Sequence, residues 1–279
     1  MRAYNFSAGP AAIPEEVLKE AQAELVDYQG TGMSIMEMSH RGKEYSAVHD
    51  ETIANIKELL NIPEGYSVLF MTGGASSQFA LIPMNLLSAD ETADYTNSGA
   101  WAIKAIKEGQ LLGNVNVAAD CGKEIPTRVP SIEELNQTDG AAYLHITSNE
   151  TISGAQWKQF PEHDCLIADM SSDILSRPLD VSKFGLIYAG AQKNLGPAGI
   201  TLVIIKNELA EKCPDTVPTI MRYKTHIEQN SLYNTVPTFP VYMLCLVTRW
   251  LKAKGGLEGM EKQNIEKAAK LYAAIDSSD

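Results

Sequence analysis

The 279-residue sequence contains no apolar run that approaches the ~20 residues needed for a membrane-spanning helix. Its N-terminal stretch, MRAYNFSAGPAAIPEEV, lacks the apolar core of a secretory signal. Basic residues are fewer than acidic ones, and the formal net charge is −12. The sequence therefore predicts a protein without a membrane anchor, and the charge argues against nucleic acid or an anionic membrane as a partner.

Cysteine is also scarce and carries no motif. The four cysteines are far apart and form no C-x-x-C pair: Cys121, Cys165, Cys213 and Cys245. Free thiols in a cytoplasmic protein are the expected state. The histidines other than His40 show no metal-ligand spacing, so we predict no metal site.

What the chain does contain is an ordinary globular composition, with 44% hydrophobic and 21% charged residues. Short apolar, β-branched segments alternate with segments of helical periodicity. We expect strands at 67–71, 92–96, 114–118, 141–146, 165–168, 184–190 and 200–205, and helices at 14–28, 45–60, 78–87, 101–109, 131–136, 241–254 and 257–275.

This alternation predicts an α/β fold with three layers: a mostly parallel seven-stranded sheet with helices on both faces. The link NLGPAG between the last two strands is too short for a crossover helix, so that pair should be antiparallel. The last helix carries Ile265 and Tyr272 on one face and needs a surface to pack on.

Lys193 is unusual because it lies between two apolar strands, in YAGAQKNLGPAG. Burial would disfavour its charged form. Asp169 ends a neighbouring strand, in CLIADMSSD, and ligands of open α/β sheets bind at such strand ends. A lysine and an aspartate so placed suit pyridoxal phosphate, whose aldehyde reacts with an amine and whose pyridine nitrogen pairs with a carboxylate. An ion pair at the sheet edge is the alternative.

Three further segments are typical of sites for this cofactor. In MTGGASSQFAL a strand ends, two glycines allow a tight turn, and a helix begins near Ser76. The N–H groups at such a helix N-terminus can bind an anion. The alternative is an ordinary turn with a serine N-cap. Trp101 follows another strand and could stack on an aromatic ring or simply fill the core. His40 and Arg41 are adjacent cations that suit a phosphate or carboxylate, or form a solvated charged face.

Together and in this order, the segments FSAGPA, SHRGKE, GGAS, TSNET, ADMSSDILSRP, GAQKNLGPAG and YNTVPTF resemble the phosphoserine aminotransferases, fold type I enzymes that depend on pyridoxal phosphate. The resemblance covers essentially the whole chain. It implies a large domain of the fold type I aminotransferases, with transfer of an amino group from glutamate to 3-phosphohydroxypyruvate. The products are 2-oxoglutarate and O-phosphoserine, a step of serine biosynthesis.

The resemblance also implies roles for single residues. Lys193 would hold the cofactor covalently and Asp169 would bind its pyridine nitrogen, with both counted as catalytic. The other implied cofactor contacts are Trp101 on the ring, Ala75 and Ser76 at the phosphate, Gln192 beside the lysine, and Thr151 at the ring oxygen. Asn234 and Thr235 would reach the phosphate of a neighbouring subunit, which implies a homodimer with shared sites. His40 and Arg41 would bind the distal anion of the substrate.

Two departures from the family pattern are visible. Val236 stands where members usually have proline, in Asn234-Thr235-Val236-Pro237-Thr238. We also expect the C-terminal small domain, which carries an arginine for the substrate α-carboxylate, to be largely absent. The expected division is an N-terminal arm at 1–15, a large cofactor domain at 16–255 and the start of a small domain at 256–279. Rival interpretations are a fold type I enzyme with other substrates and a non-catalytic fragment that keeps the fold.

Overall fold

The computed structural model describes residues 2–122 and 126–278. It contains one seven-stranded sheet in the order β1-β7-β6-β5-β4-β2-β3. The strands are β1 (Tyr66–Met71), β2 (Thr92–Asn97), β3 (Asn114–Asp120), β4 (Leu144–Thr147), β5 (Leu166–Asp169), β6 (Leu186–Gly190) and β7 (Thr201–Lys206). All neighbours are parallel except β1 with β7 and β6 with β7. The prediction that the last two strands pair antiparallel is confirmed.

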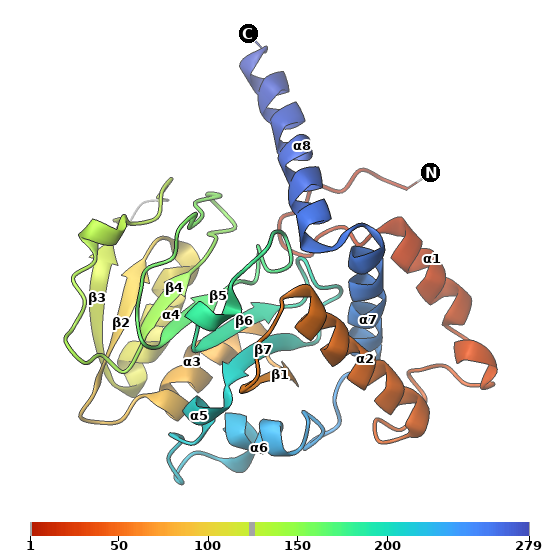
Figure 1. Ribbon diagram of the computed structural model, residues 1–279, viewed down its shortest axis with the longest axis horizontal. Helices are drawn as coiled ribbons and strands as arrows, with labels where there is room; N and C mark the ends of the chain where they lie inside the picture. Colours follow the sequence, from red (N-terminus) through yellow and green to blue (C-terminus); the bar gives the residue numbers. More distant parts are fainter. Residues whose placement is uncertain (1, 123–125, 279) are drawn as a thin grey trace.

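Helices cover both faces of the sheet, so the fold has the three predicted layers (Figure 1). The layer against Val68, Ile146 and Ile187 contains α1 (Glu15–Glu24), α2 (Lys43–Leu59) and α7 (Thr238–Ala253). The other layer, against Leu69, Tyr95 and Tyr188, contains α3 (Gly74–Leu86), α4 (Ala100–Leu112), α5 (Asn207–Ala210) and α6 (Tyr223–Glu228). Alternate residues of each strand therefore enter separate cores.

The last helix, α8 (Gly256–Asp276), extends away from the sheet toward the C-terminus (Figure 1). Leu257 at its start is buried in the core. Farther along, the apolar side chains of Ile265, Leu271, Tyr272 and Ile275 are exposed. No helix in the described ranges is both long and apolar enough to cross a bilayer.

Three predicted helix bounds are wrong. The helix expected at 131–136 is a single 3-10 turn, Ile132–Glu134, because Leu135 is extended and ends it. Glu134 caps the start of this turn by accepting from the N–H of Ser131 at 2.7 Å. The first helix ends at Glu24 rather than near Tyr28, which lies in a separate 3-10 turn. The helix expected from 78 begins at Gly74, with Gly73 rather than Ser76 as its N-cap.

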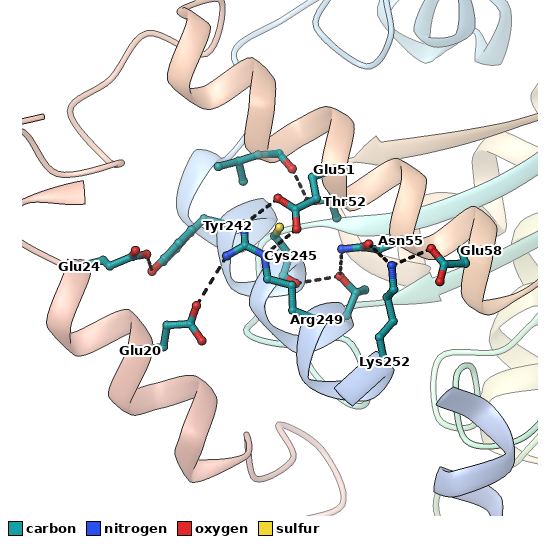
Figure 2. A network of polar contacts seen from close by, with 12 residues as sticks. Glu20, Glu24, Glu51, Thr52, Asn55, Glu58, Tyr242, Cys245, Arg249 and Lys252 are labelled. Carbon is teal, nitrogen blue, oxygen red and sulfur yellow. Dashed lines mark hydrogen bonds and ion pairs between the residues drawn. The ribbon is translucent and has the colours of Figure 1, made fainter. Parts of the chain in front are cut away.

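A network of ion pairs fixes α2 and α1 to α7 (Figure 2). The Arg249 guanidinium pairs with both carboxylate oxygens of Glu51 at 2.6 Å, and Lys252 pairs with Glu58 at 2.6 Å. The Tyr242 hydroxyl donates to Glu24 at 2.6 Å. Both ion pairs rise in residue number in the same direction, from Glu51 with Arg249 to Glu58 with Lys252. Helices α2 and α7 therefore run parallel and begin at the same end.

Candidate active site

The candidate site lies where β4, β5 and β6 end side by side. Thr147 of β4 pairs with Asp169 of β5, and Asp169 pairs with Tyr188 of β6. Parallel strands bring their carboxyl ends to one edge of a sheet, so the turns that follow these strands converge. The turn after β6 carries Lys193, and the turn after β4 carries Thr151.

Lys193 is half-buried and contacts two of the residues predicted with it. Its Nζ donates to Oγ1 of Thr151 at 2.5 Å and lies 5.2 Å from the ring centroid of Trp101. Burial lowers the pKa of Lys193, and the charge of Asp169 is the largest effect that opposes this shift. A lysine with a lowered pKa has more of the neutral amine that attacks an aldehyde.

Asp169 is the last residue of β5 and is 4% exposed. Burial raises the pKa of its carboxyl group, and hydrogen bonds from Ser171 are the largest opposing effect. The backbone N–H of Ser171 donates to Oδ1 at 2.9 Å. A buried carboxylate beside a lysine requires a cationic or hydrogen-bonding partner to stay charged, and a protonated pyridine nitrogen would be such a partner.

Ala75 and Ser76 lie in the first turn of α3, which has no side-chain cap. Its N-cap, Gly73, has a φ of +92°, and a Cβ there would lie 1.8 Å from Oγ of Ser77. Only glycine therefore permits this turn. An uncapped helix N-terminus next to two hydroxyl-bearing residues is suited to a phosphate.

Trp101 lies in the first turn of α4, with its ring partly buried. Its Nε1 is buried and has no hydrogen-bond partner in the described residues. The ammonium of Lys104 lies 4.2 Å from the centroid of the Trp101 ring. Gln192 is half-buried, and its backbone carbonyl oxygen accepts from the backbone N–H of Ala11 at 2.9 Å.

Asn234 and Thr235 lie in the loop before α7. Asn234 lines a cavity of about 270 Å³ together with Gly73 and Ser77, so it faces the turn before α3 of its own chain. This loop also accepts a hydrogen bond from Arg41, whose Nη2 lies 3.2 Å from the carbonyl oxygen of Leu232.

Four of the predicted residues thus lie together, and two others lie apart from them. Lys193, Asp169, Thr151 and Trp101 surround one point at the sheet edge. His40 and Arg41 belong instead to the segment before α2, and no hydrogen bond in the described ranges joins them to the first group. The imidazole Nε2 of His40 is buried and has no hydrogen-bond partner within 2–122 and 126–278, and Arg41 is exposed.

Sequence reasoning missed several polar residues that support this site. Glu150 binds the start of α4, and His145 contacts Tyr188. The Ser148 hydroxyl lies within hydrogen-bond distance of the backbone carbonyl oxygen of Asp169 and of the carboxylate of Asp173. A signal for Ser148 and Glu150 does exist in the sequence, because both directly follow a strand in the TSNET segment and polar residues at a strand end often belong to a site. The pairing of His145 with Tyr188 depends on strand order, which the sequence does not give.

Comparison with known proteins identifies the family to which the chain is similar. The family model for class-V aminotransferases matches residues 3–279. The phosphoserine aminotransferase of Niallia circulans is 56% identical, covering 99% of this chain and 77% of the relative. That of Bacillus subtilis is 51% identical, covering 100% and 77%.

Solved structures show the same relationship. The phosphoserine aminotransferase of Bacillus circulans subsp. alkalophilus superposes with a TM-score of 0.96 at 56% identity, covering 99% of this chain and 77% of that one. The pyridoxal-phosphate-bound enzyme of Trichomonas vaginalis gives a TM-score of 0.94 at 42% identity, covering 99% and 83%.

Proposed function

We propose that this chain, which belongs to the phosphoserine aminotransferases of the class-V aminotransferase family, transfers an amino group from glutamate to 3-phosphohydroxypyruvate. Glutamate gives the amino group and becomes 2-oxoglutarate. 3-Phosphohydroxypyruvate takes it and becomes O-phosphoserine, a precursor of serine. The observation that carries the proposal is the contact of Lys193 with Thr151 and Trp101 beside a buried Asp169.

The residues at the sheet edge fit pyridoxal phosphate, the cofactor of this family. Lys193 offers an amine of lowered pKa, Asp169 a buried carboxylate and α3 an uncapped N-terminus for the phosphate. Ala75 and Ser76 would hold the phosphate, Trp101 would cover the ring, and Thr151 and Gln192 would flank it. When bound, the cofactor supplies an electron-withdrawing ring that stabilises negative charge on the substrate α-carbon.

The chain's own groups would then handle the proton and the substrate. Nζ of Lys193, which donates to Thr151, would take the proton that leaves the substrate α-carbon, and general base catalysis of this kind is typically worth ~10²–10⁴ in rate. Asp169 would keep the pyridine nitrogen of the cofactor protonated through a charge-assisted hydrogen bond. His40 and Arg41 would bind the distal phosphate or carboxylate, since both can donate to an anion.

We further propose that the enzyme is a cytoplasmic homodimer whose sites are shared. The four free cysteines suit a reducing compartment. The hydrogen bond from Arg41 to Leu232 and the parallel pairing of α2 with α7 make the segments at 40–41 and 234–235 one unit. Within the single chain Asn234 lies beside the turn before α3, and in the proposed dimer this unit would instead enter the site of the neighbouring subunit.

The experiment for the reaction is to mix the purified protein with pyridoxal phosphate, glutamate and 3-phosphohydroxypyruvate and to measure 2-oxoglutarate and O-phosphoserine. Equal amounts of the two products are expected. Product formation with another acceptor acid but not with 3-phosphohydroxypyruvate would contradict the substrate assignment.

Shared sites can be tested by mixing Lys193→Ala chains with Asn234→Ala chains. If Asn234 acts in the neighbouring site, a mixed dimer contains one intact site and activity returns. If Asn234 acts within its own chain, both sites of the mixed dimer stay defective and activity does not return.

A further inference from the structure

Two helices begin at the same edge of the sheet, and their N-termini differ. Both α3 after β1 and α4 after β2 have glycine N-caps, Gly73 and Gly99, and neither has a cap from its own N-cap side chain. The N-terminus of α3 is open toward the candidate phosphate site. The N-terminus of α4 already holds a carboxylate, that of Glu150.

The Glu150 carboxylate accepts three hydrogen bonds at the start of α4. The N–H of Trp101 donates to Oε2 at 3.3 Å, the N–H of Ala102 donates to Oε1 at 3.2 Å, and the Ser98 hydroxyl donates to Oε1 at 3.3 Å. A carboxylate at this position is also stabilised by the positive end of the helix dipole. Glu150 therefore caps a helix that is far from it in sequence.

Glu150 is 1% exposed, and none of the ion pairs found among the described residues involves it. A buried carboxylate without a cationic partner needs hydrogen bonds to offset its lost hydration. The α4 N–H groups supply them. In turn, the carboxylate satisfies N–H groups that the first turn of a helix leaves without partners.

Gly99 makes the close approach of Glu150 possible. Its φ is +153°, and a Cβ at this position would lie 2.8 Å from Cδ of Glu150. Any other residue would push the carboxylate away from the helix. The segment NSGAWAIK therefore needs glycine at position 99, because a side chain there would collide with Glu150.

The position of Glu150 connects it to the site by two routes. Its acceptor contact fixes the backbone of Trp101, whose ring centroid lies 5.2 Å from Nζ of Lys193. It also directly precedes Thr151, whose Oγ1 accepts from the same amine. Its own backbone is fixed as well, because its N–H donates to Ala155 at 2.8 Å and its carbonyl oxygen accepts from Gly154 at 2.7 Å.

We propose that Glu150 is a positioning residue that fills the N-terminus of α4, fixes Trp101 and Thr151 around Lys193, and leaves α3 as the helix whose N-terminus receives the cofactor phosphate. This inference rests on the proposed function, because it assigns the two anions of the site to two different helices. It requires no contact between Glu150 and the cofactor or substrate.

The test compares the full chain with Glu150→Ala, Glu150→Gln and Ser98→Ala. In the cofactor-free protein, amide hydrogen exchange of a peptide covering 99–105 reports the cap directly. We expect exchange there to be faster by about tenfold in Glu150→Ala, less so in Glu150→Gln, and little changed in Ser98→Ala, which keeps both backbone contacts. Pyridoxal phosphate affinity should fall in the same order.

Sodium formate provides a second measurement, because a small carboxylate can enter the space left in Glu150→Ala. Formate, compared with chloride at equal ionic strength, should restore protection of 99–105 and cofactor affinity in Glu150→Ala but not in Glu150→Gln. If both Glu150→Gln and Glu150→Ala show the wild-type rate of amide exchange at 99–105 and the wild-type affinity for pyridoxal phosphate, the positioning role is overturned. If Glu150→Ala fails to fold, wild-type behaviour of Glu150→Gln alone would do so. Failure of the wild-type protein to bind pyridoxal phosphate would instead contradict the proposed function.

Discussion

The hydroxyl of Tyr188 lies 2.9 Å from Nε2 of His145, and both side chains are buried in the core beneath α3 and α4. Tyr188 is also the cross-strand partner of Asp169. Burial, followed by the nearby carboxylate of Asp169, raises the pKa of Tyr188 well above its ordinary value. Asp169 therefore has a neutral hydroxyl and a neutral imidazole behind it, not a second charged pair.

His145 should make the protein sensitive to acid. Burial lowers its pKa from 6.5 to about 3, so below pH 6.5 the unfolded chain binds a proton that the folded chain does not. The free energy of unfolding should then fall with decreasing pH, by up to about 1.4 kcal/mol per pH unit for this residue. In His145→Asn this component is absent. Urea titrations between pH 6.5 and 4.5 measure it, and equal slopes in both proteins would contradict the prediction.

Lys193→Arg should keep a positive charge at the site but lose transamination, because a guanidinium does not react with the cofactor aldehyde. In the wild-type protein, borohydride reduction should attach the cofactor to a peptide containing Lys193, as read by mass spectrometry. Lys104, whose ammonium lies near the same indole, is the matched control, and Lys104→Arg should retain labelling. Label on a lysine other than Lys193 would refute the assignment.

Asp169→Asn should weaken pyridoxal phosphate binding by about ten- to a hundredfold, since a charge-assisted hydrogen bond contributes about 1.5–3 kcal/mol. Asp173→Asn is the control. Asp173 is also a buried carboxylate, but it binds Ser148 at 2.5 Å and Gln156 at 3.1 Å and should affect stability more than affinity. Titration of both variants with the cofactor, followed by absorbance, compares the two. A larger loss of affinity in Asp173→Asn would show that the wrong carboxylate had been assigned.

Gly73→Ala and Gly74→Ala separate backbone strain from a steric clash. Both glycines have positive φ, so each alanine should cost about 1–2 kcal/mol of stability. Only at position 73 would the new Cβ also meet Ser77, while position 74 has open space. Gly73→Ala should therefore show the larger loss in both denaturant stability and cofactor affinity. Equal losses would mean that Ser77 moves away without affecting the turn.

Arg249→Met should destabilise the contact of α2 with α7 by about 1 kcal/mol at neutral pH, because the ion pair is partly exposed. The hydrogen bond from Arg249 lowers the pKa of Glu51 below its usual 4.5. That contribution is present above pH 4.5 and disappears as the pH falls through the lowered value. The difference between wild type and variant should thus shrink as the pH is lowered below 4.5, as measured by thermal unfolding. A difference that stays constant down to pH 3 would contradict the role of the ion pair.

The sequence predicted the strands and long helices well because their apolar patterns are long and regular. The predicted segment 67–71 starts one residue after β1 and ends with it, and 200–205 is shifted by one residue from β7. The prediction failed at 131–136, where a single turn capped by Glu134 resembles a helix start in sequence.

The site was only partly predictable for a similar reason. Lys193 and Asp169 could be found because Asp169 ends one strand, Lys193 follows another, and neighbouring strand ends converge. Glu150 also follows a strand, but its role as a helix cap could not be predicted, since its partners are N–H groups at 101 and 102 and backbone groups leave no signature in a sequence. The order of β4 between β2 and β5, which brings His145 beside Tyr188, also depends on contacts between distant segments.

The side-by-side pairing of Thr147, Asp169 and Tyr188 limits which insertions and deletions this enzyme can tolerate. Loss of one residue inside β5 would exchange Asp169 for its neighbour on the opposite face, and the carboxylate would enter the wrong core. Residues added to the surface loops between these strands would leave the pairing unchanged. Length variation among related enzymes should therefore collect in the loops, while β4, β5 and β6 keep a constant number of residues.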